Sequence, residues 1–114
     1  MGNNVFYIYI RLRGATRSNL PPAVRKILFS DCGDVMHLSL SVCKEPETEE
    51  VIAEKVKFWK DNMATIEADG GVAELVIHQI RISNGGLELS PTMVRAIAQA
   101  NLSLHMTYTV CNLK

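Results

Sequence analysis

The chain has 114 residues, of which twelve are basic and twelve acidic, so its formal net charge is zero. This length fits one domain, residues 1–114, with a core large enough to need no disulfide or metal. Because the chain has no net positive charge, it lacks the electrostatic attraction that binds a phosphate backbone or an anionic membrane. Nucleic acid and membranes are therefore disfavoured as partners.

The first third of the chain predicts two strands and a short helix. Residues 5–13 alternate apolar and polar side chains with period two, as a half-buried strand requires. Two prolines fit the first turn of a short helix that begins near Pro22. After a turn at 30–34, residues 36–43 alternate again. The predicted polar faces consist of Tyr7, Tyr9, Arg11 and Arg13 in the first strand, and His37, Ser39, Ser41 and Cys43 in the second.

The longest predicted helix runs from Pro46 to about Ala68. Its apolar residues recur in steps of three and four, which places them on one stripe. Glutamates in its first turn and two glycines after its last turn agree with the helix dipole and with a left-handed cap. Residues 72–83 then carry apolar side chains on both faces, which predicts a central strand. The stripe of the helix consists of Ile52, Val56, Trp59, Met63 and Ile66.

The final segment predicts a turn, a helix and a closing strand. Residues 84–86 fit a tight turn, after which 87–89 are expected to form a brief extra strand. Ser90 is expected to cap a helix with Pro91 in its first turn. Residues 102–110 alternate without interruption. The inward residues of that helix are Met93, Val94 and Ile97, and the polar face of the closing strand consists of Ser103, His105, Thr107 and Thr109.

These elements predict an α+β fold, a two-layer sandwich in which a mixed sheet of four or five strands has its helices on one face. Such an arrangement covers the apolar stripes and leaves the other sheet face open. A ferredoxin-like fold is the alternative, but it needs a direct hairpin between its second and third strands, where the pattern places the longest helix. The apolar stripes leave the order of the strands open.

Three segments of the second half of the chain follow the pattern of a known family. They are residues 71–82, the run Gly86-Leu87-Glu88-Leu89-Ser90-Pro91 that enters a helix, and the closing run 102–108. In these segments the chain resembles a widespread family of small, mainly bacterial domains of unknown function. The resemblance implies a similar architecture. It implies no catalytic position, because neither an activity nor site residues are established for that family.

The cysteines and the N-terminal segment bear on location. Cys32, Cys43 and Cys111 are odd in number and match no CxxC or Cys/His metal spacing, so we expect reduced thiols and no disulfide framework. The N-terminal segment has no basic leader region, and Arg11 and Arg13 interrupt its apolar run. We therefore expect a cytoplasmic protein without a signal peptide or a membrane span.

The shared chemistry of the polar strand faces is the main clue to function. Tyrosine, arginine, histidine and hydroxyl side chains on an open sheet suit a polar surface that another protein can stack against. The sequence thus predicts a non-enzymatic interaction module that forms a homodimer or binds another protein. The residues assigned to this interaction face are Tyr7, Tyr9, Arg11, Arg13, His37, Ser39, His105 and Thr107.

A small-molecule, metal-binding or enzymatic site on the same face is the first alternative. His37 and His105 are expected to share this face, and a metal would need a third ligand from His78 or Cys43. Arginines such as Arg81 could bind an anion there. Because the spacing matches no known catalytic or metal signature, we expect no catalytic residue, no metal and no cofactor.

RNA binding by the open sheet is the second alternative. Tyr7 and Tyr9 point the same way and could stack on bases. The strand at 72–83 lacks the Lys/Arg-Gly-aromatic run of RNA-recognition sheets, and the net charge is zero. Both observations disfavour nucleic acid.

Overall fold

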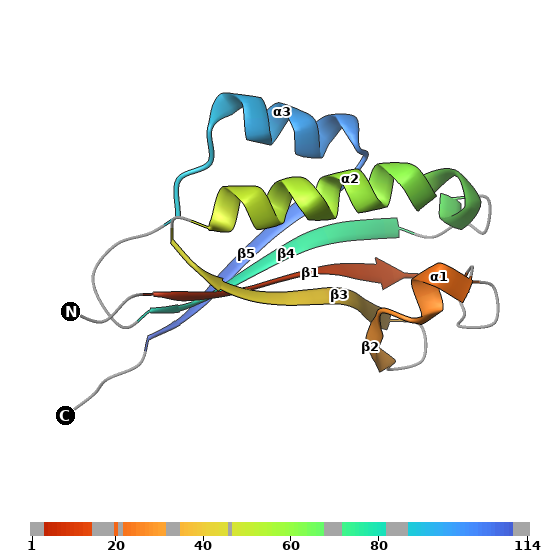
Figure 1. Cartoon of the computed structure of the whole chain (residues 1–114), viewed down its shortest axis with the longest axis horizontal. Coiled ribbons are helices and arrows are strands. Elements are labelled where there is room, and N and C mark those ends of the chain that lie inside the picture. Colours follow the sequence, from red (N-terminus) through yellow and green to blue (C-terminus); the bar gives the residue numbers. More distant parts are fainter. Residues whose placement is uncertain are drawn as a thin grey trace.

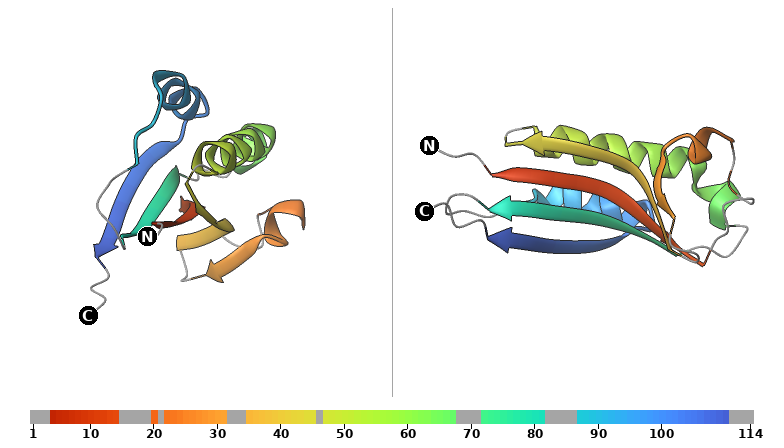
Figure 2. Two further views of the ribbon diagram at one scale, coloured as in Figure 1. Left: turned by 60° about the vertical axis from the view of Figure 1, so that its left-hand side comes forward. Right: turned by 90° about the horizontal axis from the view of Figure 1, so that it is seen from below.

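The computed structural model describes residues 4–14, 20, 22–31, 35–45, 47–67, 72–81 and 87–110. In this part of the chain the helices α2 and α3 lie over one face of a sheet, and no helix covers the opposite face (Figures 1 and 2). The elements follow one another as β1 (Val5–Arg13), α1 (Pro22–Arg25), β2 (Leu28–Asp31), β3 (Val35–Lys44), α2 (Thr48–Glu67), β4 (Val72–Arg81), α3 (Pro91–Gln99) and β5 (Ser103–Val110).

The sheet has five strands in the order β2-β3-β1-β4-β5. The neighbours β2 and β3, β3 and β1, and β1 and β4 are antiparallel, whereas β4 and β5 are parallel. The sheet is therefore mixed, and the predicted α+β sandwich with its helices on one face is confirmed. The central position expected for residues 72–83 is also found, because β4 lies between β1 and β5.

The first six elements follow the β-α-β-β-α-β order of a ferredoxin-like fold. The hairpin that this alternative requires is present, because β2 and β3 pair directly. The sequence interpretation missed β2 and assigned residues 30–34 to a turn, since a strand of four residues offers too little alternation to recognise. The sequence argument against the ferredoxin-like alternative is therefore wrong for β1 to β4, and α3 and β5 extend that unit beyond β4.

The core lies between the sheet and α2. All four apolar side chains on the inner side of β1 are fully buried, as are Ile52, Trp59 and Ile66 on the predicted stripe of α2. Burying one large apolar side chain contributes about 1.5–3 kcal/mol, so this layer supplies much of the stability of the domain. The inner residues of β1 are Phe6, Ile8, Ile10 and Leu12.

A bulge in β3 reverses the predicted faces of its second half. The register against β1 shifts between Ile8 and Ile10, and Ser39 in the bulge has a φ of 58°. An extra residue moves all later side chains to the opposite side of the sheet. Leu40 and Val42, which were expected under the helices, are instead 41% and 56% exposed on the other face. Ser39 was assigned to the interaction face, and its side chain instead contacts α2.

Other expectations differ from the structure near the C-terminal end. Residues 87–89 form no strand, and the turn expected at 84–86 lies outside the described residues. Ser90 does cap α3, since its Oγ accepts a hydrogen bond from the backbone N–H of Met93 at 3.2 Å. Val94, expected to face inward, is 49% exposed. Among the described helices, none has the length and apolar character needed to cross a membrane.

Candidate functional site

The side of the sheet away from α2 and α3 brings most of the predicted interaction residues together. We call this surface the open face, and its strands are seen side by side from below in Figure 2. Its membership follows from the strand register, because residues directly opposite each other share a face. The open face consists of Val5, Tyr7, Tyr9, Arg11, Arg13, Val35, His37, Leu40, Val42, Lys44, Val72, Glu74, Val76, His78, Ile80, Ser103, His105, Thr107 and Thr109.

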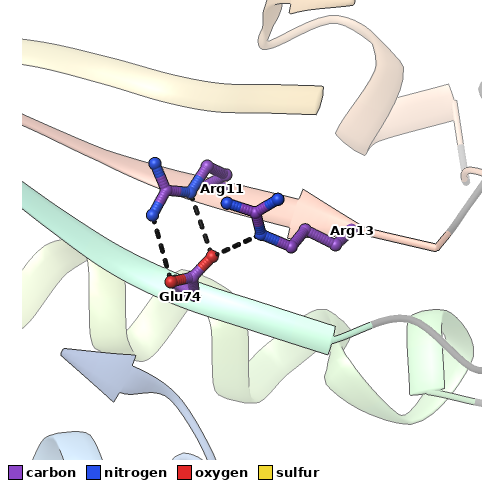
Figure 3. Close-up of polar contacts among 3 residues, drawn as sticks. All are labelled: Arg11, Arg13 and Glu74. Carbon is purple, nitrogen blue, oxygen red and sulfur yellow. Dashed lines mark hydrogen bonds and ion pairs between the residues drawn. The ribbon is translucent and has the colours of Figure 1, made fainter. Parts of the chain in front are cut away.

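An ion-pair cluster lies on the open face where β1 ends and β4 begins (Figure 3). Arg11 donates from Nε to Oε1 of Glu74 and from Nη2 to Oε2, both at 3.0 Å. Arg13 donates from Nε to Oε1 at 2.9 Å. These hydrogen bonds stabilise the carboxylate, so they lower the pKa of Glu74 from 4.5 to about 2. Glu74 therefore stays ionised at neutral pH and is unsuited to proton transfer there.

The rings of Tyr9 and His37 pack beside this cluster. Their centroids are 5.0 Å apart, and the ring planes are tilted by 58°. Burial lowers the pKa of His37, and the positive charges of Arg11 and Arg13 lower it further. His37 is therefore neutral at physiological pH, and it contributes an aromatic surface without adding charge.

Hydroxyl groups from β5 engage both ring nitrogens of His78. Thr107 Oγ1 lies 2.5 Å from Nδ1, and Thr109 Oγ1 lies 3.0 Å from Nε2. In a neutral imidazole one nitrogen donates and the other accepts, and a hydroxyl can serve either role. His78 thus links β4 to β5, as a satisfied polar contact between strands.

The structure places His37 and His105 on the same face but apart from each other. They lie on β3 and β5, with β1 and β4 between them. Three strand spacings amount to about 14 Å, so the two imidazoles are too far apart to share a ligand. Cys43, considered as a third ligand, is buried on the helix side. Among the described residues, no three His, Cys, Asp or Glu side chains are grouped closely enough to hold a metal ion.

Exposed apolar side chains lie toward both ends of the open face, since Val72 is opposite Arg13 and Val42 is opposite Tyr7. Tyr7, Leu40, Val42 and Val72 are 38%, 41%, 56% and 59% exposed. Val76 also belongs to the open face, yet it is only 1% exposed. The open face therefore combines paired charges with apolar surface that remains in contact with water.

Sequence reasoning missed two functional contacts. Glu74 was not singled out, because its pairing with Arg11 and Arg13 depends on β4 lying beside β1. Lys55 of α2 was not singled out either, although it lies three residues after Ile52 and four before Trp59 on the buried side of the helix. Its side chain reaches the β3 bulge, and burial lowers its pKa. Lys55 Nζ donates to Ser39 Oγ at 2.9 Å and to Ser41 Oγ at 2.6 Å.

Comparisons of the chain with models of protein families, with curated proteins and with solved structures find no match. The function must therefore be inferred from the open face itself. In that face Arg11 and Arg13 pair with Glu74, and several apolar side chains are exposed.

Proposed function

We propose that the protein is a non-enzymatic interaction module whose copies associate through the open face, forming a homodimer. The observation that carries this proposal is the combination of a cluster of mutually paired charges, with a net charge of +1, and four exposed apolar side chains. Because Glu74 already pairs with Arg11 and Arg13, a partner can cover these charges without leaving an ionised group unpaired. The exposed apolar groups gain free energy when they leave water.

The size of the open face is consistent with such a contact. Four long strands present a surface of roughly 20 by 30 Å, from the spacing between strands and the rise along them. A stable interface buries about 800 Å² of each partner. Two open faces stacked on each other would therefore approach the area of a specific dimer.

The same geometry supports the interaction module over the two alternatives. An RNA-binding sheet needs arginines that can reach phosphates, whereas Arg11 and Arg13 both donate to Glu74. A catalytic site needs a group that exchanges protons near neutral pH. The lowered pKa of Glu74, about 2, disfavours this carboxylate for that role.

The proposal is tested by the mass of the particle in solution. Val42→Asp places a charge beside the exposed Tyr7, its cross-strand partner, and the 56% exposure of Val42 means that the fold should tolerate the change. We expect wild type to contain at least two copies by multi-angle light scattering, and Val42→Asp to dissociate more readily. Ala53→Asp is the matched control, because Ala53 is exposed on α2 in the other layer. Equal masses for all three proteins over the same concentration range would contradict the proposal.

A further inference from the structure

The outer edge of β5 is a second surface with the properties of an interface. β5 is the last strand in the sheet, and β4 is its partner on the inner side. Figure 2 shows β5 at the margin of the sheet, and all eight of its residues are exposed. A free edge presents a row of backbone donors and acceptors that can pair with another strand.

β5 lacks the features that protect edge strands from pairing. Its sequence from Ser103 to Val110 contains no lysine, arginine, aspartate, glutamate or proline. Its register against β4 runs without a shift, so no bulge twists the edge away. The opposite edge is different, since β2 has only four residues. Within the described part of the chain, β5 is therefore the long edge of this sheet without such protection.

An apolar stripe runs along the helix side of β5. Its four residues are Leu104, Met106, Tyr108 and Val110, which are 40%, 46%, 60% and 54% exposed. They share the face that is buried in β1 and β4, but the helices do not cover them at this edge. A cavity of about 150 Å³ beside Leu104, between α3 and the start of β5, continues the apolar surface. The stripe thus has the apolar composition of the core, but its side chains remain exposed to water.

We propose that a second copy of this chain pairs with β5 along this edge, antiparallel, so that two five-stranded sheets join into one of ten strands. In a two-fold arrangement around an axis normal to the sheet, opposite residues must lie on the same face. Residues of the apolar face then lie opposite residues of the same face, and all four apolar residues are matched when Leu104 of one copy faces Val110 of the other. The helices of both copies also fall on one side, where α3 of each can approach the joined stripe.

Charge favours a second copy as the occupant. β5 carries no permanently charged side chain, so two identical strands meet without repulsion. Arg81, the nearest cation, lies 4.4 Å over the ring of Tyr108 towards the end of the strand. Antiparallel pairing places the two Arg81 side chains at opposite ends of the contact. A second copy carries the same apolar stripe and therefore matches it. An extended segment of another protein could pair with the backbone groups, but it would match the stripe only if it carried apolar side chains at the same spacing.

This edge contact does not involve the open face, so the edge proposal can be tested independently of the proposed function. Edge pairing leaves the open faces of both copies uncovered on one side of the ten-stranded sheet. If both contacts exist, the assembly contains more than two copies. Substitutions on the two surfaces therefore distinguish the two proposals.

Met106→Lys tests the edge contact. Met106 is 46% exposed, so the isolated fold should tolerate lysine, whereas a paired edge would have to bury two ammonium groups. Native mass spectrometry should show fewer copies for Met106→Lys than for wild type, with association weakened by at least about tenfold. In wild type, amide hydrogen exchange in β5 should slow as protein concentration rises, and Met106→Lys should abolish that dependence.

Val42→Asp serves as the comparison, because it perturbs only the open face. If the edge contact exists and the open face makes none, wild type is a dimer, Met106→Lys a monomer and Val42→Asp still a dimer. The edge proposal is overturned if Met106→Lys has the wild-type mass at every concentration. It is equally overturned if exchange of the β5 amides in wild type is independent of concentration.

Discussion

Glu74→Gln should destabilise the fold measurably at neutral pH, because Glu74 is the shared acceptor for two arginines. The pKa of Glu74 is lowered from 4.5 to about 2 by hydrogen bonds from Arg11 and Arg13. One pKa unit corresponds to 1.36 kcal/mol, so the upper bound on the stabilisation is about 3 kcal/mol. The side chains of Glu74 and Arg13 are 18% and 51% exposed, and water weakens the pairs. We therefore expect a loss of about 1–2 kcal/mol in the free energy of unfolding.

The pH dependence gives the sharper test. Because the folded-state pKa is depressed, the stabilisation is fully present above the ordinary pKa of 4.5. It is lost as the pH falls from 4.5 towards 2, where the folded protein also takes up the proton. Urea denaturation of wild type and Glu74→Gln at one protein concentration should therefore give stabilities that differ at pH 7 and converge near pH 2.

Glu88→Gln is the matched control, because Glu88 is an exposed glutamate outside the sheet. It should change stability by much less than Glu74→Gln at pH 7. The reasoning is refuted if the two variants are equally stable at pH 7. It is also refuted if the difference between wild type and Glu74→Gln stays constant between pH 7 and pH 2.

Two further substitutions test the packing of the helices. Ser90→Ala removes the cap of α3 and should cost about 1 kcal/mol in urea denaturation, whereas Ser103→Ala on exposed β5 should cost much less; equal effects would argue against the cap. Lys55→Met tests the lowered pKa of Lys55, since the unfolded chain holds its proton up to the ordinary value of 10.5 while the folded protein releases it earlier. Wild type should therefore gain stability relative to Lys55→Met as the pH rises towards 10.5, and a relative loss over that range would contradict the burial of a charged amine.

The elements with a strong repeating pattern were predictable from the sequence. β1 alternates over nine residues, and α2 keeps its apolar stripe over several turns, so local spacing alone defined both. β2 was missed because it is defined by pairing with β3 and not by its own pattern. The bulge at Ser39 was equally hidden, since continued alternation through Leu40 and Val42 looks the same with or without an extra residue.

The candidate site depended on information that the pattern did not contain. The faces of β1 predicted that Arg11 and Arg13 point to the open side, but only the strand order brings Glu74 between them. The same order separates His37 from His105, which removes the geometry needed for a shared ligand. The alternation of β5 was clear from the sequence, whereas its exposure follows from its place at the edge of the sheet.

The most direct test of the central claim is the mass of wild type, Val42→Asp and Ala53→Asp by multi-angle light scattering over a range of concentrations. Association through the open face predicts that wild type and Ala53→Asp form the same assembly of at least two copies. It also predicts that Val42→Asp loses copies at concentrations where the other two remain assembled. A wild-type monomer throughout the range, or a Val42→Asp assembly as stable as wild type, would contradict the account.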